Sequence, residues 1–293
     1  VGDPDHRDGA PDVDTLVLRS VPDENARAQM IATGEVDGTV LPPALAAGLA
    51  DRDGLELVSV GSADWRAVAL PTAHPFTGDP AVRRALTLAV DRESLVEHVL
   101  ARHGRPATSP ITDAYPEHEP EGEAGEQAHA DPAARRADAR GQLAEAGWRP
   151  GPDGVLVRGG SADRAEFVLA YPVADSLRRE LASAVADQLR EVGVAVELWG
   201  GTWDEIEARA GEVAVLLGGG DNPYTVDTQA YRTLHSPTPL SGPLDNPGGY
   251  GDADVDRALD AARRAADPAE RTRLYRQAQR AYLQNPGHLF LVT

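Results

Sequence analysis

The chain of 293 residues contains no cysteine and no lysine, so all 28 of its basic residues are arginine. The absence of cysteine excludes disulfides, thiolate nucleophiles, iron–sulfur clusters and cysteine zinc sites. The absence of lysine excludes a lysine Schiff base and the phosphate loop that ends in Gly-Lys-Ser/Thr. These two absences leave little catalytic chemistry to propose for the chain.

Acidic residues outnumber basic ones by 47 to 28, which gives a formal net charge of −19. The arginines are interleaved with the acids, whereas a protein that binds DNA or RNA normally presents a basic face. We therefore expect no nucleic-acid partner. The wealth of Ala, Arg, Asp, Gly and Pro is typical of a GC-rich genome, and adaptation to high salt is the alternative explanation of the charge.

Long apolar runs are also absent: none approaches the roughly 20 residues of a membrane-spanning helix. No signal peptide is visible, because the chain opens on the largely polar residues 1–5. Aromatic residues make up only 5% of the chain. We expect a chain that does not itself span a membrane and whose core depends on Leu, Val and Ala.

Segments with the period of a strand alternate with segments with the period of a helix, which predicts an α/β fold. The predicted strands are 15–18, 36–41, 55–60, 65–70, 155–157, 167–170, 194–198, 213–217 and 288–292. The clearest predicted helices are 81–90, 92–100, 133–146 and 175–192, and two more follow Asp252 and Asp267. Residues 106–131 and 221–250 are rich in turn-forming residues and are predicted to be loops. The prolines at 71–80 suggest a domain boundary between residues 1–70 and 71–293.

An acidic stretch carries the first candidate for a metal site. His118 and His129 flank five glutamates, and imidazole and carboxylate groups can hold a divalent ion. Glycines and prolines separate these residues, however, and their spacing matches no metal-binding motif. We expect a solvated acidic loop, no bound metal and no cofactor.

The second candidate is the run Gly218-Gly219-Gly220-Asp221, which follows a predicted buried strand. It lacks the Gly-x-Gly-x-x-Gly spacing of a dinucleotide site, and Asp221 would repel a phosphate. Glycines let a ligand approach the backbone closely, and a carboxylate beside a cleft can pair with an ammonium group. Asp221 is either such an anchor or an ordinary turn residue. Tyr224 and Tyr231 either stack on a ligand or pack in the core.

Five segments in order resemble the family 5 extracellular solute-binding proteins, which serve ABC importers for dipeptides, oligopeptides, nickel complexes and some sugars. They are residues 25–37 (NARAQMIATGEVD), 75–92 (PFTGDPAVRRALTLAVDR), 143–148 (LAEAGW), 189–197 (LREVGVAVE) and 267–279 (DPAERTRLYRQAQ). The second is similar to the most diagnostic stretch of the family, in which a Pro-Phe loop precedes Val-Arg-x-Ala-Leu-x-x-Ala-Ile-Asp-Arg.

The resemblance implies a type II periplasmic-binding-protein fold, in which two lobes close on a solute. Residues 217–222 (LGGGDN) look like the family's Gly-Trp-x-Gly-Asp-Asn segment, in which the Asp anchors the α-amino group of a peptide. On this resemblance Asp221 is the anchor, and Gly219, Asn222, Tyr224 and Tyr231 are its candidate companions. Gly218 replaces the tryptophan of that segment, which removes an aromatic wall.

Family members are much longer than this chain. The resemblance therefore predicts a remnant of the first lobe and the hinge at residues 1–70, and a nearly complete C-terminal solute-binding lobe at residues 71–293. The expected function is the substrate-binding component of an ABC importer, located outside the cytoplasm. It would bind a peptide or another amine-bearing solute and an ABC permease, with no catalytic residues. The alternative is a degenerate fragment that acts as an interaction module; a hydrolase is a third hypothesis that no motif supports.

Overall fold

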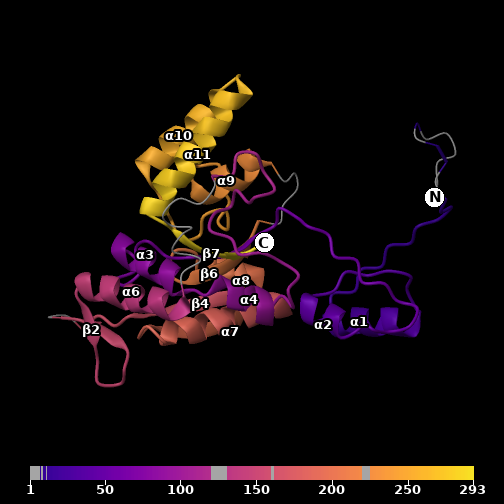
Figure 1. Cartoon of the computed structure of the whole chain (residues 1–293), viewed down its shortest axis with the longest axis horizontal. Coiled ribbons are helices and arrows are strands. Elements are labelled where there is room, and N and C mark those ends of the chain that lie inside the picture. The colour runs from indigo at the N-terminus through magenta and orange to yellow at the C-terminus, as the bar shows by residue number, and fades with distance from the viewer. Residues whose placement is uncertain (1–6, 8, 11, 120–130, 160–161, 220–224) are drawn as a thin grey trace. The chain divides into compact units, whose positions relative to one another are not determined.

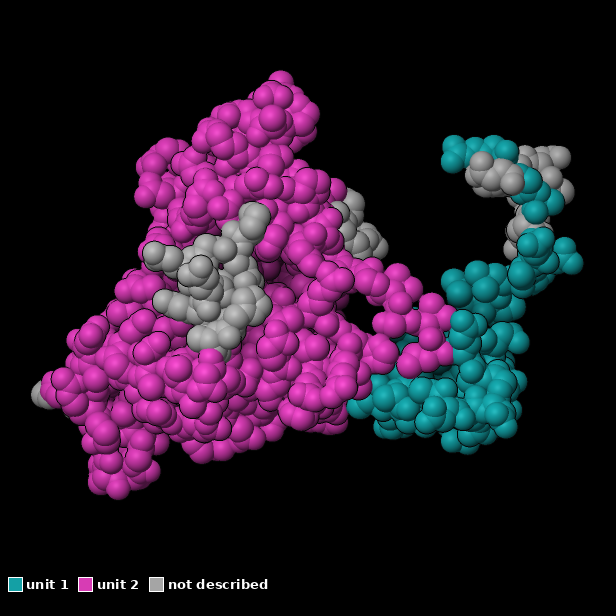
Figure 2. Space-filling model, in the orientation of Figure 1, with its two compact units in different colours: residues 1–56 teal, residues 57–293 magenta. Residues whose placement is uncertain are grey.

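The computed structural model describes residues 7, 9–10, 12–119, 131–159, 162–219 and 225–293. The chain divides into two compact units, residues 1–56 and 57–293 (Figure 2). Each unit is described by itself. The assignment of residues 1–70 and 71–293 to two lobes of a larger receptor stays a prediction.

Unit 1 contains two helices, α1 (Glu24–Thr33) and α2 (Pro43–Ala47). The residues at both ends of α1 favour a helix: the Asp23 side chain accepts a hydrogen bond from the Ala26 amide, and Gly34 ends α1 with a left-handed φ of 73°. Neither helix, however, buries a residue. The strands predicted at 15–18, 36–41 and 55–60 are wrong, because the structure shows no strand in these segments. A strand requires a hydrogen-bonded neighbour, and these segments have none among the described residues.

Unit 2 is built on a five-stranded sheet in the order β5-β4-β6-β1-β7 (Figure 1). The strands are β5 (Ala195–Gly201), β4 (Glu166–Pro172), β6 (Ala214–Gly218), β1 (Arg66–Ala69) and β7 (His288–Val292). β4 pairs in parallel with β5 and β6, whereas β1 runs antiparallel to β6 and β7. The carboxyl ends of β4 to β7 therefore lie at one edge of the sheet, together with the amino end of β1.

Helices cover both faces of this sheet (Figure 1). Val68 and Leu70 lie in a core cluster with α3 (Pro80–Ala89), α4 (Arg92–His98), α6 (Pro132–Glu145) and α7 (Ser176–Arg190). Ala67 and Ala69 point to the opposite face and join the cluster of α8 (Trp203–Glu207), α9 (Val226–Leu234), α10 (Ala253–Arg264) and α11 (Pro268–Gln284). The alternation follows from the two-residue period of a strand. The predicted α/β character is confirmed.

Most predicted elements after residue 64 are confirmed. The strand predicted at 155–157 is β3 (Leu156–Arg158), and it pairs with β2 (Trp148–Pro150), which was not predicted. The main correction is α9, which lies where a loop was predicted. Thr225 caps this helix, and Val226, Ala230 and Leu234 are buried at helical spacing. Among the described residues, no helix is long and apolar enough to cross a membrane.

Candidate functional site

The carboxyl edge of the sheet in unit 2 is where an open α/β fold normally binds its ligand. β6 reaches this edge at Gly218, and the first residue of β1, Arg66, lies opposite Gly218 in the antiparallel register. The amino ends of α7 and α8 follow β4 and β5 closely at the same edge. The end of β6, the start of β1, the β4–α7 loop and the β5–α8 loop therefore lie at the edge where the predicted ligand segment begins.

A closed set of hydrogen bonds holds the backbone at Gly219. The Gly219 amide donates to the carbonyl of Trp65 at 3.0 Å, and the Gln229 side-chain amide donates to the Gly219 carbonyl at 2.7 Å. The Trp65 indole N–H in turn donates to Gln229 Oε1 at 3.0 Å. Trp65 and Gln229 are both buried. Since both polar groups of Gly219 are satisfied by buried partners, the chain leaves the sheet here along a fixed path.

Neighbouring side chains approach the backbone closely at two consecutive positions of this path, and the approach is most restrictive at Gly219, where the neighbour is a buried indole ring. A Cβ atom at Gly219 would lie 2.4 Å from Trp65 Nε1 and 2.5 Å from Gln229 Oε1. At Gly218 it would lie 2.7 Å from both Arg66 Nη1 and Arg178 Nη2. The tryptophan expected from the resemblance at position 218 is therefore replaced by a residue on which two guanidinium groups rest.

Those two arginines form a compact group of charges with two aspartates. Arg66 pairs with Asp64 at 2.7 Å, and Arg178 pairs with Asp175, the N-cap residue of α7. The Arg178 guanidinium also lies over the Trp203 ring, 5.4 Å from its centroid. Burial, and then the neighbouring charge of Arg66, lowers the pKa of Arg178. The edge therefore presents charges of both signs, held in place by ion pairs.

The space that the described residues leave at this edge is small. A pocket of about 40 Å³ is lined by Trp65, Gly219 and Gln229 and by the Arg232–Asp245 ion pair. One water molecule occupies about 30 Å³ of liquid. The described residues therefore form only part of a solute site and do not enclose a solute.

Tyr231 is not among the residues that line this pocket. Its hydroxyl donates to Asp260 at 3.2 Å, its ring stacks on His235 at 4.3 Å, and the Arg263 guanidinium lies 3.3 Å from the ring centroid. Gln229 and Tyr231 are two residues apart on α9, which places them about 200° apart around the helix. The structure therefore brings Gly219 to Gln229 and directs Tyr231 against α10.

Three of the five predicted site residues, Asp221, Asn222 and Tyr224, lie outside the described residues. The structure adds residues that the sequence did not single out: Trp65, Arg66, Arg178 and Gln229. Their only sequence signals were the start of a predicted strand, the first turn of a predicted helix and the overlooked helical spacing of 226, 230 and 234.

The acidic stretch of the sequence gives no metal centre in the part of it that is described. His118 Nδ1 lies 2.7 Å from the Ile111 carbonyl oxygen, and Glu119 pairs with Arg280 at 2.6 Å. No group of three potential ligands occurs among the described residues. Residues 120–130, which hold His129 and three of the five glutamates, lie outside them.

The family motif around residue 83 serves packing. The buried Arg83 donates to the carbonyls of Pro286, Thr77 and Gly78 and to the Asn285 side chain. It ties the loop before α3 to the segment after α11, and burial lowers its pKa. At Arg83 the strongest sequence signal is therefore a signature of the fold.

A comparison with known families gives a match over most of the chain. The sequence profile described as "Bacterial extracellular solute-binding proteins, family 5 Middle" matches residues 3–241.

Similar proteins and solved structures agree with this match. Protein XP55 of Streptomyces lividans is 41% identical over 283 residues, which are 96% of this chain and 50% of that protein. The oligopeptide-binding protein AppA of Bacillus subtilis, solved with a nonapeptide, matches with a TM-score of 0.78 at 23% identity, over 99% of this chain and 56% of that one. NikZ of Campylobacter jejuni, solved with Ni(L-His), matches with a TM-score of 0.78 at 24% identity, over 93% of this chain and 53% of that one. The chain spans about half the length of the curated relatives it matches.

Proposed function

The chain belongs to the bacterial extracellular solute-binding proteins of family 5, and we propose that it is the substrate-binding component of an ABC importer, or the C-terminal lobe of one. Its solute would be a peptide or another amine-bearing small molecule. The proposal assigns it binding and no chemistry, and a place outside the cytoplasm beside an ABC permease. The predicted family and the predicted type II binding-protein fold are both confirmed, the fold over about half the length of solved relatives.

The observation that carries the proposal is the fixed backbone at Gly218 and Gly219 on the carboxyl edge of the sheet. Asp221 follows Gly219 by two residues in the sequence. A carboxylate that is delivered from a rigid support beside a partly dry cleft binds an ammonium group with less loss of conformational freedom. We assign to Asp221 the α-amino group of the solute, and to Asn222 and Tyr224 its neighbouring polar and apolar parts.

Tyr231 remains a proposed ligand residue with a restriction. His235 and Arg263 cover its ring and Asp260 holds its hydroxyl. A solute would therefore have to displace one of these partners to reach it. Gly219 acts through its small size, since any side chain there would enter the space of Trp65 and Gln229.

The charges at the same edge favour a solute that carries both signs. The ion pairs of Arg66 with Asp64 and of Arg178 with Asp175 place two cations and two anions within one small region. A zwitterion such as a peptide can interact with groups of either sign there. Closure of two lobes around such a solute would then be the signal that the permease reads.

Isothermal titration of this chain with a set of dipeptides tests the proposal. We expect saturable binding, and a loss of at least about tenfold in affinity for Asp221→Asn and for N-acetylated dipeptides, because each removes one partner of the charge pair. Asp138→Asn, an exposed aspartate on α6, is the matched control and should bind as the parent does. Absence of heat with every peptide, or equal affinity of Asp221→Asn and the parent, would count against the proposed role.

Unit 1 supports a second candidate function, that of an interaction module that binds no solute. It exposes Leu16, Val17, Leu18 and Val40, with between 73% and 86% of each residue's surface accessible. Leu16, Val17 and Leu18 are consecutive in the sequence, and contiguous exposed apolar residues commonly mark a protein interface. Light scattering after size exclusion separates the candidates: concentration-dependent dimers without peptide binding favour the interaction module, and a peptide-binding monomer favours the receptor.

A further inference from the structure

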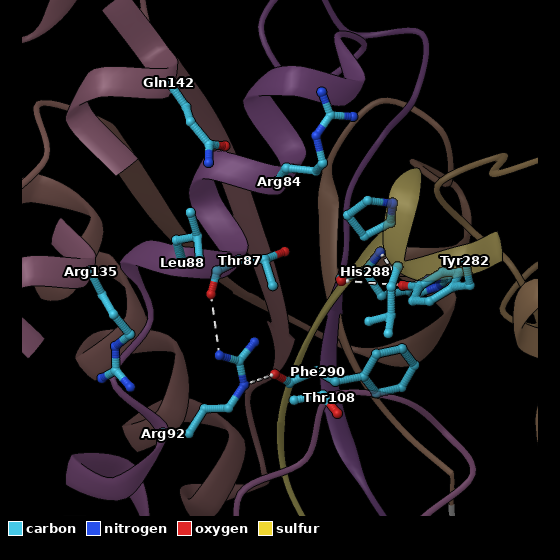
Figure 3. A pocket seen from close by; sticks show the side chains of 12 residues that line it. Arg84, Thr87, Leu88, Arg92, Thr108, Arg135, Gln142, Tyr282, His288 and Phe290 are labelled. Carbon is cyan, nitrogen blue, oxygen red and sulfur yellow. Dashed lines mark hydrogen bonds between the residues drawn. The ribbon is translucent and has the colours of Figure 1, made fainter. Parts of the chain in front are cut away.

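A second cavity, of about 110 Å³, lies in unit 2 between α3, α6, the end of α11 and β7 (Figure 3). It is separate from the carboxyl edge. Its strand residue His288 pairs with Ala69 at one end of β1, whereas Arg66 at the other end faces Val292. Among the residues that the structure describes, none lines both this cavity and the small pocket at Gly219.

Positive charge surrounds this cavity. Figure 3 places the guanidinium groups of Arg84, Arg92 and Arg135 on different sides of it, from α3, from the start of α4 and from α6. Arg84 donates to the Gln284 carbonyl, Arg92 donates to the carbonyls of Ala107 and Phe290, and Arg135 pairs with Asp91 at 3.1 Å. Among the described residues the lining itself contains no carboxylate. Asp91 offsets the charge of Arg135, so Arg84 and Arg92 supply the positive charge that an anion would meet in this cavity.

His288 adds a buried polar group that lacks a partner. It is only 2% exposed, and its Nε2 atom has no hydrogen-bond partner among the described residues. The Tyr282 hydroxyl lies 3.3 Å from both the His288 carbonyl oxygen and His288 Nδ1; when it donates to Nδ1, the imidazole proton is on Nε2. Burial lowers the pKa of His288 to about 3, so the ring is neutral at physiological pH. A buried unpaired donor is unfavourable unless a ligand or water accepts from it.

The remaining walls are partly apolar and set the size of the ligand. They are formed by the apolar Leu88, Leu283, Pro286 and Phe290 and by Thr87, Thr108, Gln142 and Tyr282. A cavity of about 150 Å³ can hold one benzene molecule, so this smaller one suits a ligand of at most about six non-hydrogen atoms. We infer that the cavity binds a small monocarboxylate with a short apolar chain. Its carboxylate would lie among the guanidinium groups and the imidazole, and its chain would lie against Leu88 and Phe290.

Titration of this chain with sodium butyrate, followed by calorimetry or ligand-observed NMR, tests the inference. We expect saturable binding with a dissociation constant of about 1 mM or tighter. Butyramide, which has the same shape without the charge, should bind at least about tenfold more weakly. Inorganic phosphate, which has the charge without the apolar chain, should also bind more weakly.

Two variants locate the binding. Leu88→Trp fills the half-buried wall of the cavity and should abolish butyrate binding, and Arg84→Gln should weaken it about fivefold to tenfold. Arg273→Gln, which changes an exposed ion pair on α11, is the control. Its dissociation constant for butyrate should lie within about twofold of that of the parent. Circular dichroism checks that each variant is folded.

Three outcomes would overturn the inference: no saturable butyrate binding, equal binding of butyramide or phosphate, or unchanged binding in Leu88→Trp. The inference does not depend on the proposed peptide site. Dipeptide binding should be unaffected by Leu88→Trp, and butyrate binding should be unaffected by Asp221→Asn, so the two proposals can fail separately.

Discussion

The helices of units 1 and 2 begin with similar capping residues but differ in how many side chains they bury. Helix α1 has an aspartate N-cap and a left-handed glycine at its end, and α7 has an aspartate N-cap of the same kind. Yet α1 buries no residue, whereas α7 buries five, among them Leu181 and Leu189. The difference is the sheet, which gives α7 an apolar face to cover. Capping and propensity define where a helix starts and ends, but burial against a second layer supplies most of its stability.

Core truncation should separate the two units most strongly. Leu181→Ala in α7 removes a fully buried side chain and should lower the free energy of unfolding by about 3 kcal/mol. Leu18→Ala in unit 1 removes a side chain that is 86% exposed and should change it by less than about 0.5 kcal/mol. Urea denaturation followed by circular dichroism measures both values. A large effect of Leu18→Ala would show that unit 1 has a core of its own or a partner.

Lowering the pH should destabilise unit 2 through the buried side chain of His288. Because burial depresses the pKa of His288 from about 6.5 to about 3, the unfolded chain binds a proton that the folded chain refuses. Stability from this group is present above pH 6.5 and is lost as the pH falls toward 3, at about 1.4 kcal/mol per pH unit. We expect a loss of about 2 kcal/mol between pH 6.5 and 5.

The contribution of His288 is isolated by comparing slopes rather than absolute stabilities. His288→Gln cannot titrate and should flatten the pH dependence over this range, measured by urea denaturation at each pH. His98→Gln, which changes an exposed histidine, should keep the slope of the parent. Equal slopes in the parent and in His288→Gln would contradict the neutral, buried imidazole.

Glycine substitutions give the smallest and most local contrast. Gly219→Ala places a methyl group 2.4 Å from Trp65 Nε1 and should destabilise unit 2 by about 1 to 2 kcal/mol. Gly38→Ala in unit 1 meets no atom within 4 Å and should be close to neutral, within about 0.5 kcal/mol. Thermal unfolding monitored by tryptophan fluorescence detects the first change directly, because Trp65 is the residue displaced. If both substitutions were neutral, the path of the backbone at Gly219 would be less fixed than its hydrogen bonds indicate.

The errors in the prediction of secondary structure fall where tertiary contacts decide. Residues 15–18 and 55–60 have the period of a strand, but a strand exists only when another strand pairs with it. Helix α9 was missed because the surrounding glycines and prolines masked the spacing of Val226, Ala230 and Leu234. Periodicity reports which side chains share a face, and it cannot report whether that face meets a partner.

The candidate site was predictable only in part for the same reason. Gly219 was found because the run of glycines follows a strand, and the structure gives it a reason in the close approach of Trp65 and Gln229. Those two residues are 164 positions apart in the chain, and no local pattern links them. The charged group of Arg66 and Arg178 likewise arises from two distant segments.

By itself the sequence determined the class of the fold, the family and the ends of most helices, because caps, periodicity and the ordered motifs are local properties of the chain. It also determined the absence of lysine and cysteine chemistry. Only the tertiary structure decided which of the strand-like segments pair, which arginines of the motifs are buried as supports, and which distant side chains lie at the carboxyl edge and around the cationic cavity. Sheet pairing and charge clustering depend on contacts between remote residues, and those contacts exist only once the sheet and its two layers of helices have assembled.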